Sequence, residues 1–421
     1  MKSFLLICYS YPPYPGTGGR RWAKLSKYLA MAGNKIYVIN SVNKHSNSIW
    51  EKDTIHPNIK LYSFENKYEH IINNITIPLI QKIISKVFFI LSKIKTNANY
   101  SDQSLWWNDN AYAKAKEIIK ENKIDYLLIS CPPYHIMDKF SGLKKEFPQI
   151  KLILDYRDIW TISQKGKGFF SHLSDKRFSQ EALKETNALL QADYVFTVAD
   201  EMTHAIKERF KNKKVITVHN GFDEEDIDEN FIPDNNSPYL QPGKLNMLFA
   251  GSLVTDSNTY AIPFFNALLK LKIEKPELYL KLNLCIFGNV NSEIATMISE
   301  HGLNCVTFFS PVSSKAIGKI YKEFDFLLLF LIPYYTYAFI SKFFDYLPAR
   351  KPIICISEKG SFSKYLEGND LGKNIEPENI YVNLVNILSF NTKIKINTSF
   401  DISKFNYQRL AQKIVETITY N

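Results

Sequence analysis

The stretch 326–356 constrains the fold of this chain more than any other. Phe326–Ile332 is an uninterrupted apolar run, which is typical of a strand buried on both faces of a parallel sheet. Pro333 follows it, and the next residues have helical spacing until Pro348. A second apolar run, Ile353–Ile356, comes next. Strand, helix and strand in this order predict a βαβ unit of a doubly wound α/β sheet.

Two charged residues near the start of this predicted helix are candidates for ligand binding. Lys342 and Asp345 are three residues apart, so they lie on neighbouring parts of one helical face. In βαβ units, ligands bind beyond the carboxyl ends of the strands and against helix N-termini. A lysine there suits a diphosphate, and an aspartate suits the hydroxyls of a ribose. An ordinary surface pair on a core helix is the alternative that these residues leave open.

The length and composition indicate a two-domain globular protein. The chain has 421 residues, of which 45% are apolar and 22% charged. Its five cysteines have no metal-site spacing and lie mostly in apolar runs, so we expect them to be buried thiols in a reducing compartment. The apolar run before Pro12 is too short for a signal peptide or a membrane span. The net charge of +10 suits anionic lipid or sugar phosphates, and no nucleic-acid-binding motif accompanies it.

A Pro/Gly loop follows the first predicted strand, Ser3–Tyr9. Gly16, Gly18 and Gly19 precede a predicted helix and let backbone amides approach an anion. A dinucleotide fingerprint needs G-x-G-x-x-G and an acid at the end of the second strand. The loop reads G-T-G-G and the second strand, Lys35–Asn40, ends without an acid, so NAD binding is not predicted. A turn that needs glycine for its backbone angles is the alternative.

The segment Lys151–Trp160 ends a predicted strand in a dense polar group. Arg157 is able to bind a phosphate with two parallel hydrogen bonds. The flanking acids Asp155 and Asp158 could hold the arginine or accept from a sugar hydroxyl. A structural Arg–Asp pair at a strand end is the alternative.

The second half of the chain repeats the α/β pattern after a linker. Residues 223–244 are acidic, contain three prolines and have no periodicity, which predicts an interdomain linker. Apolar runs over 247–250, 282–287 and 306–309 then recur as predicted strands, and small or polar residues follow them, among them Gly251 and Ser252 after the first and Gly288 after the second.

Two of these segments resemble a known enzyme family. K-x-F-D-Y-L followed by K-P-I-I, from Lys342 onward, is similar to a segment of the bacterial retaining glycosyltransferases of family 4, which have the GT-B fold. D-x-R-D-x-W, from Asp155 to Trp160, is similar to a subgroup that acts in surface-polysaccharide assembly. The resemblance implies two Rossmann-like doubly wound domains that face each other across a cleft.

The resemblance also implies roles for particular residues. Asp345 would hold the ribose of a nucleotide-sugar, and the backbone at Val312 would read its base. Lys342 and Arg157 would stabilise the leaving diphosphate, and Asp158, also a catalytic candidate, would hold Arg157 or accept from a sugar hydroxyl. Further donor contacts would come from Gly18, Gly19, Gly251, Ser252, Gly288 and Ser341. The acceptor side would include Arg20, Asp155, Trp160 and Asn220.

The sequence departs from the family in two places. Tyr337 stands where many members have a second acid, eight positions before Asp345. The loop GSLVTDSNTY after residue 250 has no basic residue, although family members use basic residues there to hold the diphosphate. We therefore expect Lys342, a helix N-terminus and Arg157 to carry that charge.

These features predict an acceptor-side domain over 1–222, a linker over 223–244, a donor domain over 245–400, and a C-terminal helix in 401–421 that crosses back to the first domain. The predicted activity is transfer of a hexosyl or N-acetylhexosaminyl group, with retention, to a glycan or polyprenyl-diphosphate-linked acceptor of a bacterial capsule or O-antigen. UDP-sugars are favoured over GDP-sugars, and no metal and no cofactor are expected. A nucleotide-sugar 2-epimerase and a non-catalytic nucleotide- or glycan-binding subunit of the same fold remain open.

The segment Pro78–Ile94 predicts the cellular location of the protein. Its apolar residues form a helical stripe, and Lys82, Lys86 and Lys93 lie opposite. Residues 71–95 contain four lysines and no acid, whereas solvated helices usually mix both signs. This pattern favours a helix on an anionic membrane surface, and hence a cytoplasmic protein at the inner face of the plasma membrane. An ordinary core face is the alternative.

Overall fold

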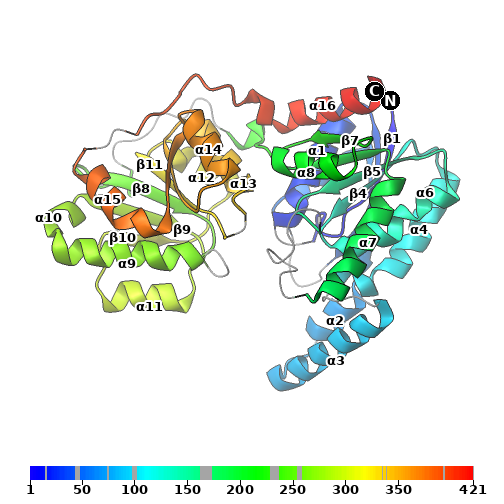
Figure 1. Ribbon diagram of the computed structural model, residues 1–421, viewed down its shortest axis with the longest axis horizontal. Coiled ribbons are helices and arrows are strands. Elements are labelled where there is room, and N and C mark those ends of the chain that lie inside the picture. Colours follow the sequence, from blue (N-terminus) through cyan, green and yellow to red (C-terminus); the bar gives the residue numbers. More distant parts are fainter. Residues whose placement is uncertain are drawn as a thin grey trace. The chain divides into compact units, whose positions relative to one another are not determined.

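The computed structural model describes residues 1–14, 17–42, 48–73, 75–96, 102–161, 173–227, 237–253, 258–333, 335–337, 339–391 and 394–420. The chain divides into two compact units. Unit 1 comprises Met1–His219 and Tyr407–Asn421, and unit 2 comprises Asn220–Asn406. Both chain termini therefore belong to unit 1 (Figure 1).

Unit 1 is built on a seven-stranded parallel sheet with the order β3-β2-β1-β4-β5-β6-β7. The order reverses between β1 and β4, which is the arrangement of a doubly wound sheet. Its strands are β1 (Ser3–Ile7), β2 (Lys35–Val42), β3 (Ile59–Glu65), β4 (Tyr126–Cys131), β5 (Lys151–Tyr156), β6 (Tyr194–Thr197) and β7 (Lys214–Thr217). Its α-helices are α1 (Arg20–Met31), α2 (Lys67–Asn73), α3 (Pro78–Thr96), α4 (Asn108–Glu121), α5 (Tyr134–Ser141), α6 (Leu143–Glu146), α7 (Asp175–Gln191), α8 (Asp200–Arg209) and α16 (Tyr407–Tyr420).

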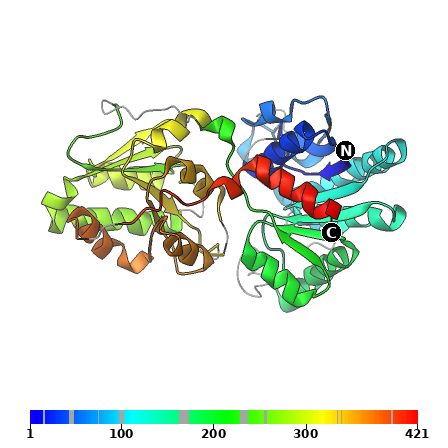
Figure 2. The ribbon, with the colours of Figure 1, turned by 90° about the horizontal axis from the view of Figure 1, so that it is seen from above.

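The C-terminal helix α16 completes the core of unit 1. Leu410 and Ile414 are buried in the same hydrophobic cluster as Trp22 and Leu25 of α1. The hydroxyl of Tyr126 on β4 donates to the carbonyl of Ile418 at 3.0 Å. The helix, drawn in red, runs along unit 1 (Figure 2). The C-terminal helix α16 therefore belongs to the same unit as the N-terminal strand β1.

Unit 2 is built on a six-stranded parallel sheet with the order β10-β9-β8-β11-β12-β13. Here the order reverses between β8 and β11. The strands are β8 (Leu245–Ala250), β9 (Leu282–Phe287), β10 (Val306–Phe309), β11 (Phe326–Phe330), β12 (Ile353–Ile356) and β13 (Gly372–Ile375). The α-helices are α9 (Asn258–Glu274), α10 (Pro276–Tyr279), α11 (Ser292–Glu300), α12 (Ser314–Tyr321), α13 (Ser341–Tyr346), α14 (Ser361–Gly368) and α15 (Ile380–Leu388).

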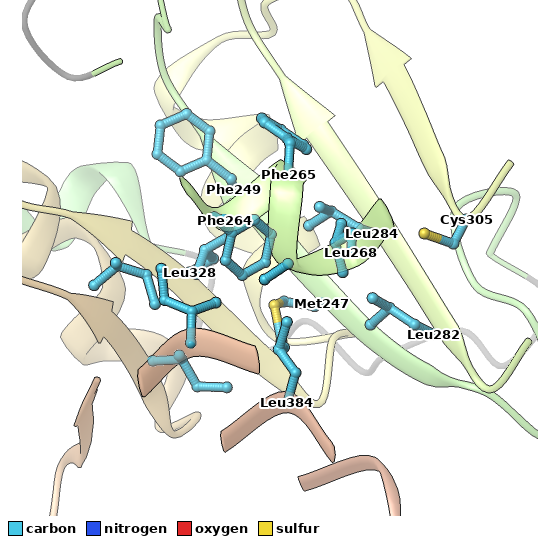
Figure 3. Close-up of a cluster of buried hydrophobic side chains, with 14 of the residues drawn as sticks. Met247, Phe249, Phe264, Phe265, Leu268, Leu282, Leu284, Cys305, Leu328 and Leu384 are labelled. Carbon is cyan, nitrogen blue, oxygen red and sulfur yellow. The ribbon is translucent and has the colours of Figure 1, made fainter. Parts of the chain in front are cut away.

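The core of unit 2 lies between its sheet and α9, α11 and α15. Met247 and Phe249 of β8 pack with Phe264 and Leu268 of α9 and with Leu384 of α15 (Figure 3). Strands β8, β9 and β12 are buried along their whole length, as expected for parallel strands covered on both faces.

The fold class predicted from the sequence is confirmed, since both sheets are parallel and alternate with helices. The sequence analysis did not predict β3, an edge strand in which only Ile59 is buried, or β13, which begins at a glycine. The helix predicted after Pro333 begins only at Ser341, and Pro348 lies in the 3₁₀ turn that follows it. All five cysteines are buried and unpaired, as expected. Of the predicted linker, residues 228–236 lie outside the described residues.

Candidate functional site

In unit 2 the sheet opens at its topological switch point, between β8 and β11. The two strands pair only through residues 247–248 and 326–327. Beyond that register, the Tyr346 hydroxyl accepts from the Ala250 N–H at 3.2 Å and donates to the Leu328 carbonyl at 3.1 Å. Tyr346 thus satisfies backbone groups that would otherwise lose their partners where the strands separate. In open parallel sheets this carboxyl edge is where ligands bind.

Lys342 of α13 reaches this edge. Its Nζ lies 3.8 Å from the centroid of the Phe249 ring, at the end of β8. Burial lowers the pKa of Lys342 to about 7, and the nearby Asp345 carboxylate acts in the opposite direction. The site therefore holds a lysine that an anionic ligand would help to keep charged.

The glycines that follow β8 and β9 bring the backbone close to this lysine. Gly251 has φ +140° and Gly288 has φ +142°, which disfavours residues with a side chain. A Cβ on Gly288 would lie 2.2 Å from the Gly251 carbonyl oxygen. The Gly251 N–H donates to the Phe287 carbonyl at 2.8 Å. Phe249 and Tyr346 were not among the predicted site residues, because the contact of Phe249 with Lys342 and of Tyr346 with the backbone of β8 and β11 arises only in the folded sheet.

In the sequence, the other donor residues predicted in unit 2 follow the carboxyl ends of its strands or begin α13. Ser252 is exposed directly after Gly251, Ser341 opens α13, and Val312 is exposed three residues after β10. Tyr337, which replaces the second acid of the family, is buried and stacks on Tyr335 with ring centroids 5.9 Å apart.

In unit 1, Asp155 holds the N-terminus of α1 against the sheet. Its carboxylate is buried and accepts from Arg21 Nη2 at 3.0 Å, Trp22 Nε1 at 2.7 Å and Ser130 Oγ at 2.8 Å. Arg21 also donates to the His219 carbonyl at 2.8 Å. The carboxylate is thus engaged within the fold, by an arginine and a tryptophan that the sequence reading did not connect to it.

Arg157 ties together the loops at the carboxyl ends of β1, β4 and β5. Its Nη1 donates to the Gly18 carbonyl, its Nη2 to the Pro132 carbonyl, and its Nε to the Cys131 carbonyl at 3.4 Å. Three of the five N–H groups of the guanidinium are therefore engaged by carbonyls of the described residues. The contact of Arg157 with the glycine loop was not predicted, and it is made to a backbone carbonyl.

The glycine loop itself is tightly packed. A Cβ on Gly19 would lie 2.1 Å from the Ser10 carbonyl oxygen, and one on Gly18 would lie 3.0 Å from Arg157 Nη1. Gly16 lies outside the described residues. Arg20 is buried, with its guanidinium carbon 5.9 Å from the centroid of the Trp50 ring.

Three predicted residues remain. Asp158 and Trp160 follow Arg157 in the sequence, and Asn220 begins unit 2. Burial raises the pKa of Asp158, against the opposing effect of the Arg157 charge. Trp160 is buried and stacks on Tyr134, with ring centroids 5.3 Å apart. Asn220 is the first residue of unit 2.

One buried acid near Trp160 was not predicted. Glu185 of α7 accepts from the backbone N–H of Thr161 at 3.0 Å and from its hydroxyl. Burial raises the pKa of Glu185 to about 7. The sequence contains a signal for its burial, because Glu181, Glu185 and Ala188 lie at helical spacing on the buried face of α7.

Comparison with known proteins adds the fold family. No family model and no curated protein matches the sequence. Among solved structures, a sucrose-phosphate synthase from Thermosynechococcus elongatus matches with a TM-score of 0.65 and 12% identity, over 100% of this chain and 99% of that one. WaaG, a glycosyltransferase involved in lipopolysaccharide biosynthesis, matches with a TM-score of 0.58 and 14% identity, over 99% and 100%. The lipopolysaccharide outer core galactosyltransferase WaaB matches with a TM-score of 0.57 and 12% identity, over 100% and 99%. With its two parallel doubly wound sheets, the chain has the GT-B fold of these glycosyltransferases.

Proposed function

We propose that this protein is a glycosyltransferase that moves a sugar from a nucleotide-diphosphate sugar to a glycan or lipid-linked acceptor. The observation that carries the proposal is the position of Lys342 at the switch point of unit 2, over Phe249 and against Gly251. A diphosphate at this sheet edge would meet the ammonium group of the half-buried Lys342 together with the backbone after β8.

The chemistry follows from where charge develops. As the bond between the sugar and the diphosphate breaks, negative charge grows on the leaving phosphate. Lys342 would stabilise that charge, and no metal ion is part of the proposal. Asp345 would accept hydrogen bonds from the ribose and hold the donor in place. Retention of the anomeric configuration and a preference for UDP-sugars belong to the proposal because of the family resemblance.

The biological setting that we propose is assembly of a bacterial surface polysaccharide, such as a capsule or lipopolysaccharide. The D-x-R-D-x-W segment from Asp155 supports it, and so do the names of the structural neighbours WaaG and WaaB. A polyprenyl-diphosphate acceptor would require the enzyme to work at a membrane surface.

A non-catalytic nucleotide-binding subunit is the second candidate, because the buried Tyr337 replaces an acid of the family. Incubation with UDP-, GDP- and dTDP-sugars and a glycan acceptor separates the candidates. A transferase releases nucleotide diphosphate and yields a glycosylated product, whose anomeric configuration NMR reads directly. A subunit binds nucleotide and releases nothing, whereas a 2-epimerase changes the sugar without any acceptor.

A further inference from the structure

Helix α3 carries an apolar surface beyond the one that packs on unit 1. Phe88 forms its inner contact, with ring centroids 5.3 Å from Tyr68 of α2 and 5.3 Å from Trp106. Ile84 is half-buried beside it. The sequence had placed both residues in one stripe with Ile80 and Ile83, whereas the structure separates an inner side from an outer one.

The outer side is apolar and exposed along the helix. We call it the outer stripe, and each of its members is between 43% and 74% exposed: Ile80, Ile83, Val87, Ile90, Leu91 and Ile94. Helical spacing puts them on one continuous face. Together with α2, the helix extends away from the sheet of unit 1 (Figure 1). Continuous apolar surface of this kind on a projecting helix marks an interaction site.

The charge beside the outer stripe has a single sign. Lys82 and Lys86 are exposed, and Lys86 is three and four residues from Ile83 and Ile90, so it borders the stripe directly. Residues 71–95 contain no aspartate or glutamate. An aliphatic face edged by lysines is the composition of helices that lie in the interface of an anionic bilayer.

Two other occupants fit this surface less well. The cores of protein–protein interfaces are depleted in lysine and enriched in aromatic residues and arginine, and the outer stripe is purely aliphatic. A second copy of α3 packed on the first would bring lysines of the same sign together. No helix among the described residues is long and apolar enough to cross a membrane.

We infer that α3 docks the protein on an anionic lipid surface, with the outer stripe among the acyl chains and Lys82 and Lys86 at the headgroups. Long lysine side chains suit this arrangement, because their methylene stems cover apolar surface while the charge stays in water. The inference stands apart from the proposed reaction, since it requires neither a donor nor an acceptor.

Flotation of the full-length protein with vesicles tests it. We expect recovery with vesicles rich in phosphatidylglycerol and little with pure phosphatidylcholine. Recovery falls at high salt, because the screening length shortens from about 10 Å at 0.1 M to about 3 Å at 1 M. The pair Lys82→Glu and Lys86→Glu weakens binding at least about 30-fold, since each lysine contributes about 1 kcal/mol near the surface.

Each substitution has a matched control on the same unit. Lys207→Glu with Lys211→Glu makes the same change of charge at the same spacing on exposed residues. Ile83→Gln with Val87→Gln removes part of the outer stripe, and Leu183→Gln with Leu190→Gln does the same on α7, where both leucines are at least 60% exposed. We expect both α3 pairs to lose binding and both control pairs to keep it.

Three results would overturn the inference. One is equal recovery with neutral and anionic vesicles. The second is an equal loss in the control pairs. The third is a concentration-dependent dimer in analytical ultracentrifugation, without vesicles, that disappears in the pair Ile83→Gln and Val87→Gln, which would assign the outer stripe to a second copy. All six positions of the α3 pairs and leucine controls are exposed or at the surface, and matching melting curves confirm that each variant is folded.

Discussion

The ammonium of Lys342 occupies the space beside Gly251 that any larger residue would need. A Cβ at position 251 would lie 2.4 Å from Lys342 Nζ and 2.9 Å from Cε. The backbone of the loop after β8 and a side chain of α13 are thus fitted to each other at the sheet edge where the proposed donor binds.

This relationship predicts the effect of Gly251→Ala. The new methyl group must displace the ammonium, and φ +140° is strained for alanine, at a cost of about 1–3 kcal/mol. We expect a lower melting temperature and weaker nucleotide binding. Gly368→Ala is the control, because no atom lies within 4 Å of its Cβ position and the residue is helical. It should be neutral or stabilising by about 0.4–1 kcal/mol. Equal behaviour of the two variants would contradict the fit.

The lowered pKa of Lys342 predicts a pH-dependent affinity. In the free protein this pKa is about 7. A bound diphosphate favours the ammonium and raises that pKa, so binding takes up a proton above pH 7. Affinity therefore falls as the pH rises through and above 7. Calorimetry at pH 8 in two buffers with different ionisation enthalpies measures the proton uptake. Lys342→Arg should abolish it, because arginine stays charged. Proton uptake that persists in Lys342→Arg would show that another group titrates.

Because Arg157 contacts three backbone carbonyls, we predict that a lysine at this position cannot maintain the stability or the activity of the protein. The variant Arg157→Lys would keep the charge and lose the planar group that spans Gly18, Cys131 and Pro132. We expect this variant to lose about 2 kcal/mol of stability, on the scale of one charged hydrogen bond, and to show lower transfer. Urea unfolding and the transfer assay measure the two effects, with the exposed Arg409→Lys as control. Unchanged stability together with unchanged transfer would contradict both roles.

The buried carboxyl of Glu185 predicts a stability that depends on pH. Its pKa is about 7 in the folded protein against an ordinary 4.5, so between these values the folded state holds the extra proton. Stability from this group is full below about pH 4.5 and is lost as the pH rises through 7. Glu185→Gln keeps an oxygen that can accept from Thr161 and removes the titration. Urea unfolding should show Glu185→Gln gaining relative to the wild type between pH 5 and pH 8. A constant difference would contradict the raised pKa.

The strands that are continuous apolar runs were predicted from the sequence, because a strand buried on both faces needs an apolar residue at nearly every position. It missed β3, because only Ile59 of this edge strand is buried, and it extended β11 by two residues, because Leu331 and Ile332 continue the apolar run. Lys342 and Gly251 were both named from local patterns. Their contact was not, because 91 residues separate them and only the switch point brings them together. Likewise, the sequence around Asp155 does not predict that Arg21 and Trp22 donate hydrogen bonds to it.

Equilibrium binding of nucleoside diphosphates tests the central claim most directly. Calorimetry with UDP, GDP and dTDP should show at least one that binds, with UDP favoured. Lys342→Ala and Asp345→Ala should each cost about 1.5–3 kcal/mol of binding free energy, which is a loss of about 10- to 150-fold. Lys270→Ala, an exposed lysine on α9, should bind as the wild type does. Failure of all three nucleotides to bind, or wild-type affinity in the folded Lys342→Ala and Asp345→Ala variants, would contradict a donor site at the switch point of unit 2.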